Sequence, residues 1–447
     1  MSARPRQAPG RLTHPAFQRG RWRLALLVPL LLLAGLTAWL VWPAAPVAVS
    51  SSTPAHDSAT LERGRYLATL GNCQHCHTPR GAPPYSGGRG ISTPFGTVYS
   101  SNLTPSPAGL GLWSADDFWR ALHHGQSRDG RWLYPAFPYT NTTHISRSDS
   151  DALYAYLRTL TPDQRTAPAH QLSWPYNTQA ALKVWRALYF RAGPEPLPQF
   201  AAEAAVSDLQ RGAYLVRGLG HCSACHAPRN ALGGHRDMLD LTGGLMATQN
   251  WYAPSLNDPQ QAGVQDWPLH RIVELFQIGR SGQAFVSGPM AEVVQHSTQF
   301  WRRADLQAMA LYLQQLPRTP APPAHSKTPA RLSETGARLY ERHCADCHGP
   351  HGQGVRGHDG QYAYPPLAGN RTVTQPVAAN LVHIVLQGGF APATPGHPRP
   401  FGMPPFVLSL SDQEVADVLS YLRTAWGNQA AAVSPLDVQQ WRHTSAP

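Results

Sequence analysis

The sequence lacks the motifs by which most enzymes hold a substrate or a soluble cofactor. It has no glycine-rich dinucleotide fingerprint, no nucleophile elbow and no motif for a catalytic metal outside the cysteine pattern described below. No segment alternates apolar and polar residues convincingly enough to predict a strand. These absences argue against a substrate site of the chain's own and favour a largely helical fold.

Cysteine is equally restricted. The chain has 6 cysteines, and all of them lie in three copies of the motif C-x-x-C-H, at residues 73–77, 222–226 and 344–348. No thiol is left over for a disulfide framework. A zinc site would require ligand pairs from distant copies to converge, and a thioredoxin-like pair would not require the histidine.

The repeated motif is the attachment signature of c-type haem. Its two thiols form thioethers with the haem vinyl groups, and the adjacent histidine ligates the iron. We therefore expect three covalently bound haems c. Their predicted attachment residues are Cys73, Cys76, Cys222, Cys225, Cys344 and Cys347, with His77, His226 and His348 as proximal iron ligands.

The N-terminus is basic and is followed by a long apolar run. Residues 1–23 carry six arginines and no acidic residue, and residues 24–42 carry no charge. Because about 20 apolar residues cross a bilayer, this pattern predicts a cytoplasmic tail (1–23), a transmembrane anchor (24–42) and an exported linker (43–57). A cleaved signal peptide is the alternative, although the run exceeds the usual ~7–15-residue apolar region. The anchored form would be a single-pass inner-membrane protein with its haem domains in the periplasm.

The net charge of +11 does not indicate a nucleic-acid partner, because six of these charges belong to the N-terminal tail. The 447 residues are sufficient for three domains of ordinary size. A short helical segment with a glycine precedes each motif, and Gly64, Gly212 and Gly336 take the same place in the three copies. A missing side chain there would let a second helix cross closely.

Each copy also ends on an amphipathic helical pattern, at residues 149–160, 304–316 and 411–423. A closing helix that crosses an opening one is the framework of small c-type cytochrome domains. The predicted fold is therefore all-α, with three tandem class-I-like cytochrome c domains after one N-terminal transmembrane helix. Their expected ranges are 58–200, 203–320 and 328–430, with a C-terminal tail at 431–447.

The second axial ligand distinguishes the three copies. A methionine thioether is the usual ligand in electron-transfer haems, and Met290 and Met403 stand in proline-containing segments before the closing helices. The first copy has Phe137 at this place, and no methionine occurs between Met1 and Met238. Its distal ligand is therefore unknown: the candidates are His123, His124 and His144, and an open or water-bound iron is the alternative.

The histidine of each motif usually donates its second N–H to a backbone carbonyl. The loops of the right kind are those at residues 101–103, 254–256 and 366–367. We expect one carbonyl acceptor from each loop.

With these motifs, the sequence resembles the three-haem cytochrome c subunits of membrane-bound bacterial dehydrogenases. Besides the C-x-x-C-H copies, the resemblance rests on residues 133–139, 291–294, 364–370, 388–390 and 399–406. It implies an electron-transfer and membrane-anchoring subunit beside a catalytic quinoprotein, flavoprotein or molybdoprotein, with ubiquinone or an oxidase as acceptor. Two alternatives remain open at this stage: a free-standing carrier between the quinone pool and an oxidase, and a haem enzyme acting at the first haem.

Overall fold

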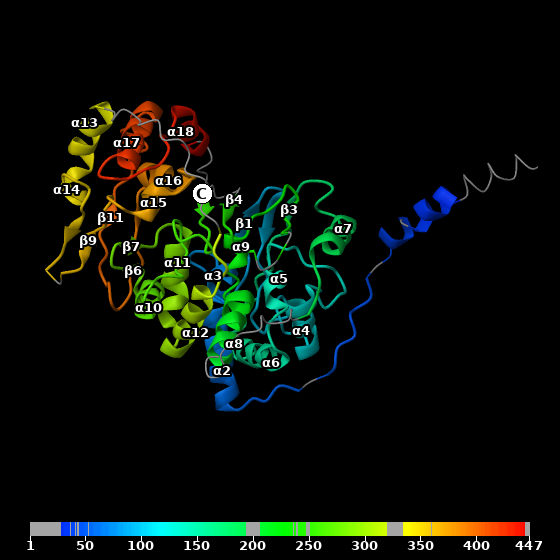
Figure 1. The fold of residues 1–447 in the computed structure, drawn as a ribbon. Coiled ribbons are helices and arrows are strands. Elements are labelled where there is room, and N and C mark those ends of the chain that lie inside the picture. The colour runs from blue at the N-terminus through cyan, green and yellow to red at the C-terminus, as the bar shows by residue number, and fades with distance from the viewer. Residues whose placement is uncertain are drawn as a thin grey trace, which may run out of the picture.

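The computed structural model describes residues 28–442, except for residues 36, 41, 43, 52, 194–205, 236, 238–239, 247–250, 320–333 and 359. Its helices and strands fall into three consecutive units, each built around one C-x-x-C-H motif (Figure 1). The two segments expected to link the units lie largely outside the described residues. The division into domains at the predicted boundaries therefore stays a prediction.

The first unit contains the opening helix, the motif helix, a small sheet and an additional helix after the closing one. Its elements are α2 (Ser58–Leu70), α3 (Cys73–His77), β1 (Gly90–Thr93), β2 (Gly96–Tyr99), α4 (Ala115–His124), α5 (Tyr139–Thr142), α6 (Arg147–Leu157), β3 (Gln171–Leu172) and α7 (Gln179–Tyr189).

The second unit has the same opening, motif and closing helices, with a π-helical turn between its opening helix and its motif. Its elements are α8 (Val206–Tyr214), η2 (Leu215–Leu219), α9 (Ser223–His226), β4 (Gly244–Met246), β5 (Trp251–Ala253), α10 (Leu269–Ile278), β6 (Arg280–Ser281), β7 (Ala284–Phe285), α11 (Pro289–His296), η3 (Thr298–Phe300) and α12 (Arg303–Gln314).

The third unit ends with one helix more than expected. Its elements are α13 (Glu334–His343), α14 (Ala345–His348), β8 (Val355–Arg356), β9 (Tyr362–Tyr364), α15 (Arg371–Thr374), α16 (Ala379–Gln387), β10 (Gly389–Phe390), β11 (Gly402–Met403), α17 (Asp412–Thr424) and α18 (Pro435–Arg442). Helix α18 lies in the segment expected to be a tail, and it packs on α16 and α17 through buried Val438 and Trp441.

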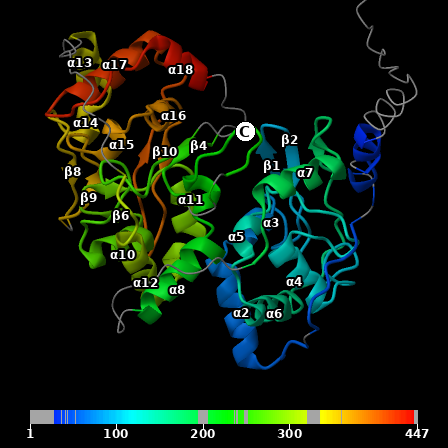
Figure 2. The same ribbon diagram turned by 45° about the vertical axis from the view of Figure 1, so that its right-hand side comes forward.

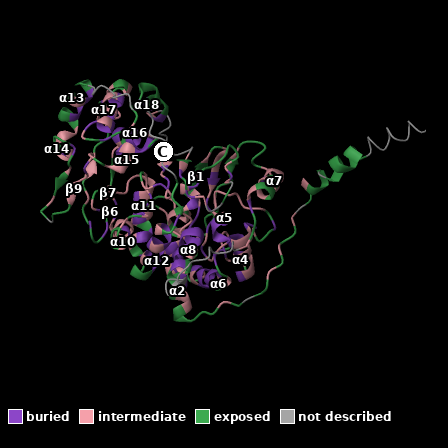
Figure 3. Cartoon of the chain, in the orientation of Figure 1, coloured by how far each residue is buried: buried purple, intermediate pink, exposed green. Residues whose placement is uncertain are grey.

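Each unit is held by a crossing between its opening and closing helices, α2 with α6, α8 with α12 and α13 with α17. A methyl group on Gly64 or Gly212 would clash with the backbone carbonyl of Ala152 or Ala308. A methyl group on Gly336 would clash with the backbone carbonyl of Asp417 in the same way. The predicted close crossing at the three glycines is confirmed, and the buried residues concentrate along these crossings (Figure 3).

The first two units share one hydrophobic core, whereas the third has its own. Figure 2 shows α8 and α2 near the boundary between the first two units, with the third unit above the second. Strand β5 reaches the third unit, where the Asn380 side chain bonds the backbone N–H and carbonyl of Tyr252 at 2.7 and 2.8 Å. The chain thus places its three motifs within one continuous body.

The prediction of an all-α chain headed by a transmembrane helix is wrong in two respects. Short antiparallel pairs of strands occur in every unit, such as Ile91 opposite Val98 in β1 and β2. Strands of two to four residues are too short to produce a recognisable alternation in the sequence. Among the described residues no helix combines the length and apolar character needed to cross a bilayer. Of the predicted span, only residues 28–35, 37–40 and 42 are described.

Candidate haem-binding site

The three motifs lie on short helices that follow the opening helix of each unit. All six thiols are free, so the chain forms no disulfide. Burial raises the pKa of the Cys73 and Cys222 thiols to about 12 and that of Cys344 to about 11. At neutral pH these three thiols are therefore protonated in the chain without haem. The described residues also contain no group of three or more potential protein ligands for a metal ion.

Each motif histidine makes the same hydrogen bond to a backbone carbonyl. Nδ1 of His77 donates to Ser101 O at 2.7 Å, Nδ1 of His226 to Pro254 O at 2.7 Å and Nδ1 of His348 to Pro365 O at 2.8 Å. A carbonyl can only accept, so the proton is on Nδ1 and the Nε2 lone pair is free. This is the tautomer that an iron ligand requires.

The carbonyl acceptors confirm the expectation for the first two copies. Ser101 and Pro254 begin the two predicted loops, while the third acceptor, Pro365, precedes the predicted Pro366 by one residue. Burial also lowers the pKa of all three imidazoles, so each is neutral and can coordinate a metal without losing a proton.

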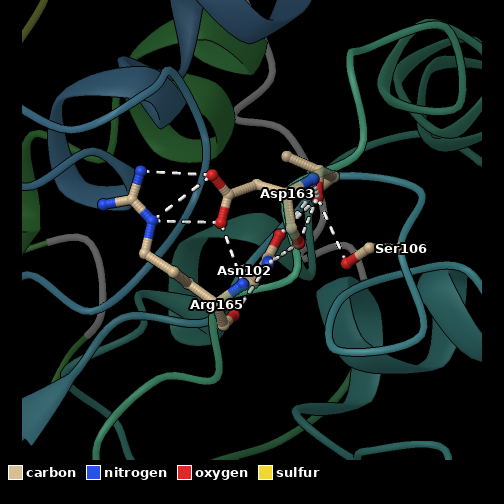
Figure 4. A network of polar contacts seen from close by, with 5 residues as sticks. Asn102, Ser106, Asp163 and Arg165 are labelled. Carbon is tan, nitrogen blue, oxygen red and sulfur yellow. Dashed lines mark hydrogen bonds and ion pairs between the residues drawn. The ribbon is translucent and has the colours of Figure 1, made fainter.

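A polar network fixes the loop that directly follows Ser101 (Figure 4). The side chain of Asn102 donates to the backbone carbonyls of Asp163 and Arg165 at 2.8 and 3.0 Å, and its oxygen accepts from the Thr104 amide. The Arg165 side chain is paired with the Asp163 carboxylate at 3.1 Å. The loop that orients His77 is therefore tied to the segment that follows α6.

A connected, mostly apolar cavity of about 1960 Å³ adjoins the motifs. Its wall includes both cysteines and the histidine of the first and third motifs. From the second motif only Ala224 and Cys225 contribute. Large apolar space beside paired thiols and a free imidazole Nε2 fits a haem, so the residues of the first and third copies match the predicted cofactor.

The two methionine candidates are placed differently. Met403 lies in β11, paired with Gly389 of β10, and lines the cavity in the third unit. Met290 is in the first turn of α11, and its neighbours Pro289 and Ala291 line the cavity while Met290 itself does not. Ligation of iron by either methionine stays a prediction.

In the first unit Phe137 lines the cavity, whereas His123, His124 and His144 do not. The rings of His123 and Trp119 lie 4.4 Å apart, and His123 Nδ1 is 3.3 Å from His124 Nε2. The structure therefore brings Phe137 to the predicted haem site and keeps the three histidine candidates outside it.

Sequence reasoning missed a contact between the first motif and the second unit. His75, inside the first motif, pairs with Glu292 at 3.1 Å and stacks on His296 with ring centroids 4.8 Å apart. Glu292 and His296 belong to α11, which also carries Met290. Residues so distant in sequence show no local pattern that could have predicted this contact.

Comparison with known proteins agrees with this geometry. Residues 61–161 and 333–426 match the cytochrome c family, so these segments form cytochrome c domains, a class that carries covalently bound haem c. The chain is 38% identical over 409 residues to the cytochrome c subunit of a quinone alcohol dehydrogenase from Gluconobacter oxydans, covering 88% of this chain and 84% of that one.

Two further relatives are subunits of other dehydrogenases. The gluconate 2-dehydrogenase cytochrome c subunit of Pantoea cypripedii is 34% identical over 406 residues, covering 86% of this chain and 90% of that one. A subunit of the nicotinate dehydrogenase of Pseudomonas putida is 38% identical over 430 residues, which cover 92% of this chain and 34% of that longer protein. The chain belongs to the family of cytochrome c subunits of bacterial dehydrogenases.

Proposed function

We propose that this protein is a three-haem electron-transfer subunit of a periplasmic dehydrogenase complex. The observation that carries the proposal is the threefold recurrence of one arrangement, in which a C-x-x-C pair stands beside a half-buried neutral histidine with Nδ1 bound to a carbonyl. Residues 58–200, 203–320 and 328–430 would each hold one haem through the cysteines and histidine of their motif.

The haem iron, when bound, supplies a centre that changes its charge by one electron. The protein's contribution is to hold and tune that centre. The carbonyls of Ser101, Pro254 and Pro365 fix the orientation of the three imidazoles. The apolar wall excludes water, and Met290 and Met403 would raise the potentials of the second and third haems relative to a histidine ligand.

The relatives suggest what lies at the two ends of the electron path. Their names include quinone alcohol, gluconate and nicotinate dehydrogenases. We infer a separate catalytic subunit, carrying a quinone, flavin or molybdenum cofactor, as electron donor and ubiquinone as acceptor. Electrons would pass one at a time through haem domains on the periplasmic side.

Purification from the native host tests this function. We expect a large cofactor-bearing dehydrogenase subunit to co-purify at unit stoichiometry, and substrate-dependent reduction of the haems to require it. Addition of a soluble ubiquinone analogue should then reoxidise the haems. A chain that always purifies alone and is reduced directly by quinol would instead indicate a free-standing carrier.

A further inference from the structure

We propose that the iron held by His77 has no side-chain ligand on its opposite face and binds a small neutral diatomic molecule there. The inference rests on the proposed haem at the first motif, and it makes that haem chemically different from the other two. It follows from which of the described residues line the cavity in the first unit and which do not.

No thioether is available in this unit. The chain has no methionine between Met1 and Met238, and Phe137 stands on the cavity wall where the third unit has Met403. Met246 also lines the connected cavity, but it lies in β4 opposite Trp251, whose ring stacks on His383 of the third unit. Met246 therefore faces the boundary between the second and third units.

The two histidines at the end of α4 lie outside the cavity wall. Phe118, Ala121 and Leu122 turn toward the cavity. His123 and His124 instead contact each other, and His123 packs on Trp119. Neither His123 nor His124 lines the cavity, so neither imidazole approaches the His77 site.

His144 is also directed elsewhere. It packs against the turn η2 of the second unit, beside Gly218, and burial together with the charge of Arg217 lowers its pKa to about 4. His144 thus belongs to the contact between the first two units.

Three further side chains on the wall, those of His170, Tyr134 and His75, are unsuited as ligands. His170 Nδ1 accepts the Tyr99 amide at 3.1 Å, so its proton is on Nε2 and neither nitrogen offers a free lone pair. Burial raises the pKa of Tyr134, which keeps its phenol protonated. His75 is paired with Glu292 and is part of the same short helix as His77.

The wall also admits a neutral ligand. Beside Phe137 the cavity in this unit is lined by the apolar side chains of Leu122, Ile145, Leu153 and Leu157, together with polar side chains such as those of Arg131 and Tyr134. A neutral diatomic such as carbon monoxide can occupy the apolar part of this space without the cost of burying a charge.

Carbon monoxide titration of the dithionite-reduced, fully haem-loaded protein tests the proposal. We expect the difference spectrum to saturate at one carbon monoxide per chain, with the haem content measured separately by the pyridine haemochrome assay. Absence of a carbon monoxide complex in a chain that carries all its haems would overturn this proposal and leave the proposed function standing. A chain without three haems would refute the proposed function itself.

Variants locate the site. Phe137→Met should supply the missing thioether, abolish carbon monoxide binding and raise the midpoint potential of one haem. The matched control Phe95→Met replaces a phenylalanine that packs on Tyr176 outside the cavity, and it should change neither property. Met403→Ala should add a second carbon monoxide. If Phe137→Met is correctly folded, as judged by circular dichroism, and still binds one carbon monoxide per chain, the assignment to His77 is wrong.

Discussion

The Tyr66 hydroxyl donates a hydrogen bond of 2.7 Å to the Asp305 carboxylate and so joins the opening helix of the first unit to the closing helix of the second. A second bond joins the opening helix of the second unit to the closing helix of the first: the Tyr214 hydroxyl donates to the Asp149 carboxylate at 2.5 Å. Each aspartate is paired in addition with an arginine of its own unit, Asp149 with Arg63 and Asp305 with Arg211. The two units are therefore related by a reciprocal exchange of tyrosine bonds.

The third unit does not take part in such an exchange. In its opening helix Thr335 and Arg338 stand at the places of the arginine and the tyrosine. Its contacts with the second unit include Asn380 on the backbone of β5, the Trp251–His383 ring stack and hydrogen bonds such as that from Arg371 to the Gly263 carbonyl, but no exchange of tyrosine bonds between opening and closing helices. We therefore expect the first two units to behave as one rigid pair and the third as a separately docked body.

Removal of one exchanged hydroxyl should weaken this pair. Tyr66→Phe leaves the Asp305 carboxylate with Arg211 alone, and a hydrogen bond to a charged group contributes about 1.5–3 kcal/mol. The free energy of unfolding, measured by denaturant titration of the haem-loaded protein, should fall by about that amount. Tyr176→Phe, at an exposed ring on Phe95, is the control and should change it by less than about 0.5 kcal/mol. Equal losses in both variants would contradict the role of the exchange.

Acid should weaken the same contact. Although burial raises the pKa of Asp305, the hydrogen bonds from Arg211 and Tyr66 lower it overall, below the ordinary value of 3.8. The stabilisation is thus complete above pH 3.8 and is lost as the pH falls through the lower folded-state value. Unfolding free energies between pH 6 and 3 should decline less in Asp305→Asn than in the wild type. Parallel plots of unfolding free energy against pH for the two proteins would exclude Asp305 as a contributor to the acid sensitivity.

The glycine crossings should tolerate no side chain. In Gly64→Ala the new methyl group would overlap the carbonyl of Ala152, so α2 and α6 must separate. Overpacking of this kind typically costs about 1–3 kcal/mol, which thermal unfolding followed by circular dichroism would detect. Gly35→Ala, where no atom lies within 4 Å of the added group, is the matched control. An unchanged melting temperature in Gly64→Ala would show that the crossing is looser than described.

The local parts of the fold could be predicted from the sequence. Helical periodicity located the closing helices, and the glycine before each motif indicated where they cross. The carbonyl partners of His77 and His226 could also be anticipated, because that bond recurs wherever a histidine ligates a metal. These features depend on residues close together in the chain or on chemistry that every copy must satisfy.

The contacts between units could not be predicted. Tyr66 and Asp305, or His75 and Glu292, come from different units, and neither member of a pair carries a local signal of its partner. The histidine candidates at the first motif also needed the structure, because only the helix orientation shows that His123 and His124 face away from the cavity while Phe137 faces it. Strands of two to four residues leave too short a pattern to recognise.

Met403→Ala should change the redox properties of one haem only. Loss of the thioether would leave the third haem attached through Cys344 and Cys347 and lower its midpoint potential. A spectroelectrochemical titration resolves the three haems by potential. Met309→Leu, at a buried core residue of α12, should leave all three potentials in place. An unchanged set of potentials in Met403→Ala would eliminate Met403 as a ligand.

The covalent haem count tests the account most directly. Intact-mass spectrometry of the protein matured with the host's haem-attachment machinery should show three haems per chain, and peptide mapping should assign one to each C-x-x-C-H motif. Cys73→Ser should weaken attachment of the first haem alone and leave two in full yield. A mature chain with fewer than three haems, or a Cys73→Ser variant that loses all of them, would contradict three separately loaded sites.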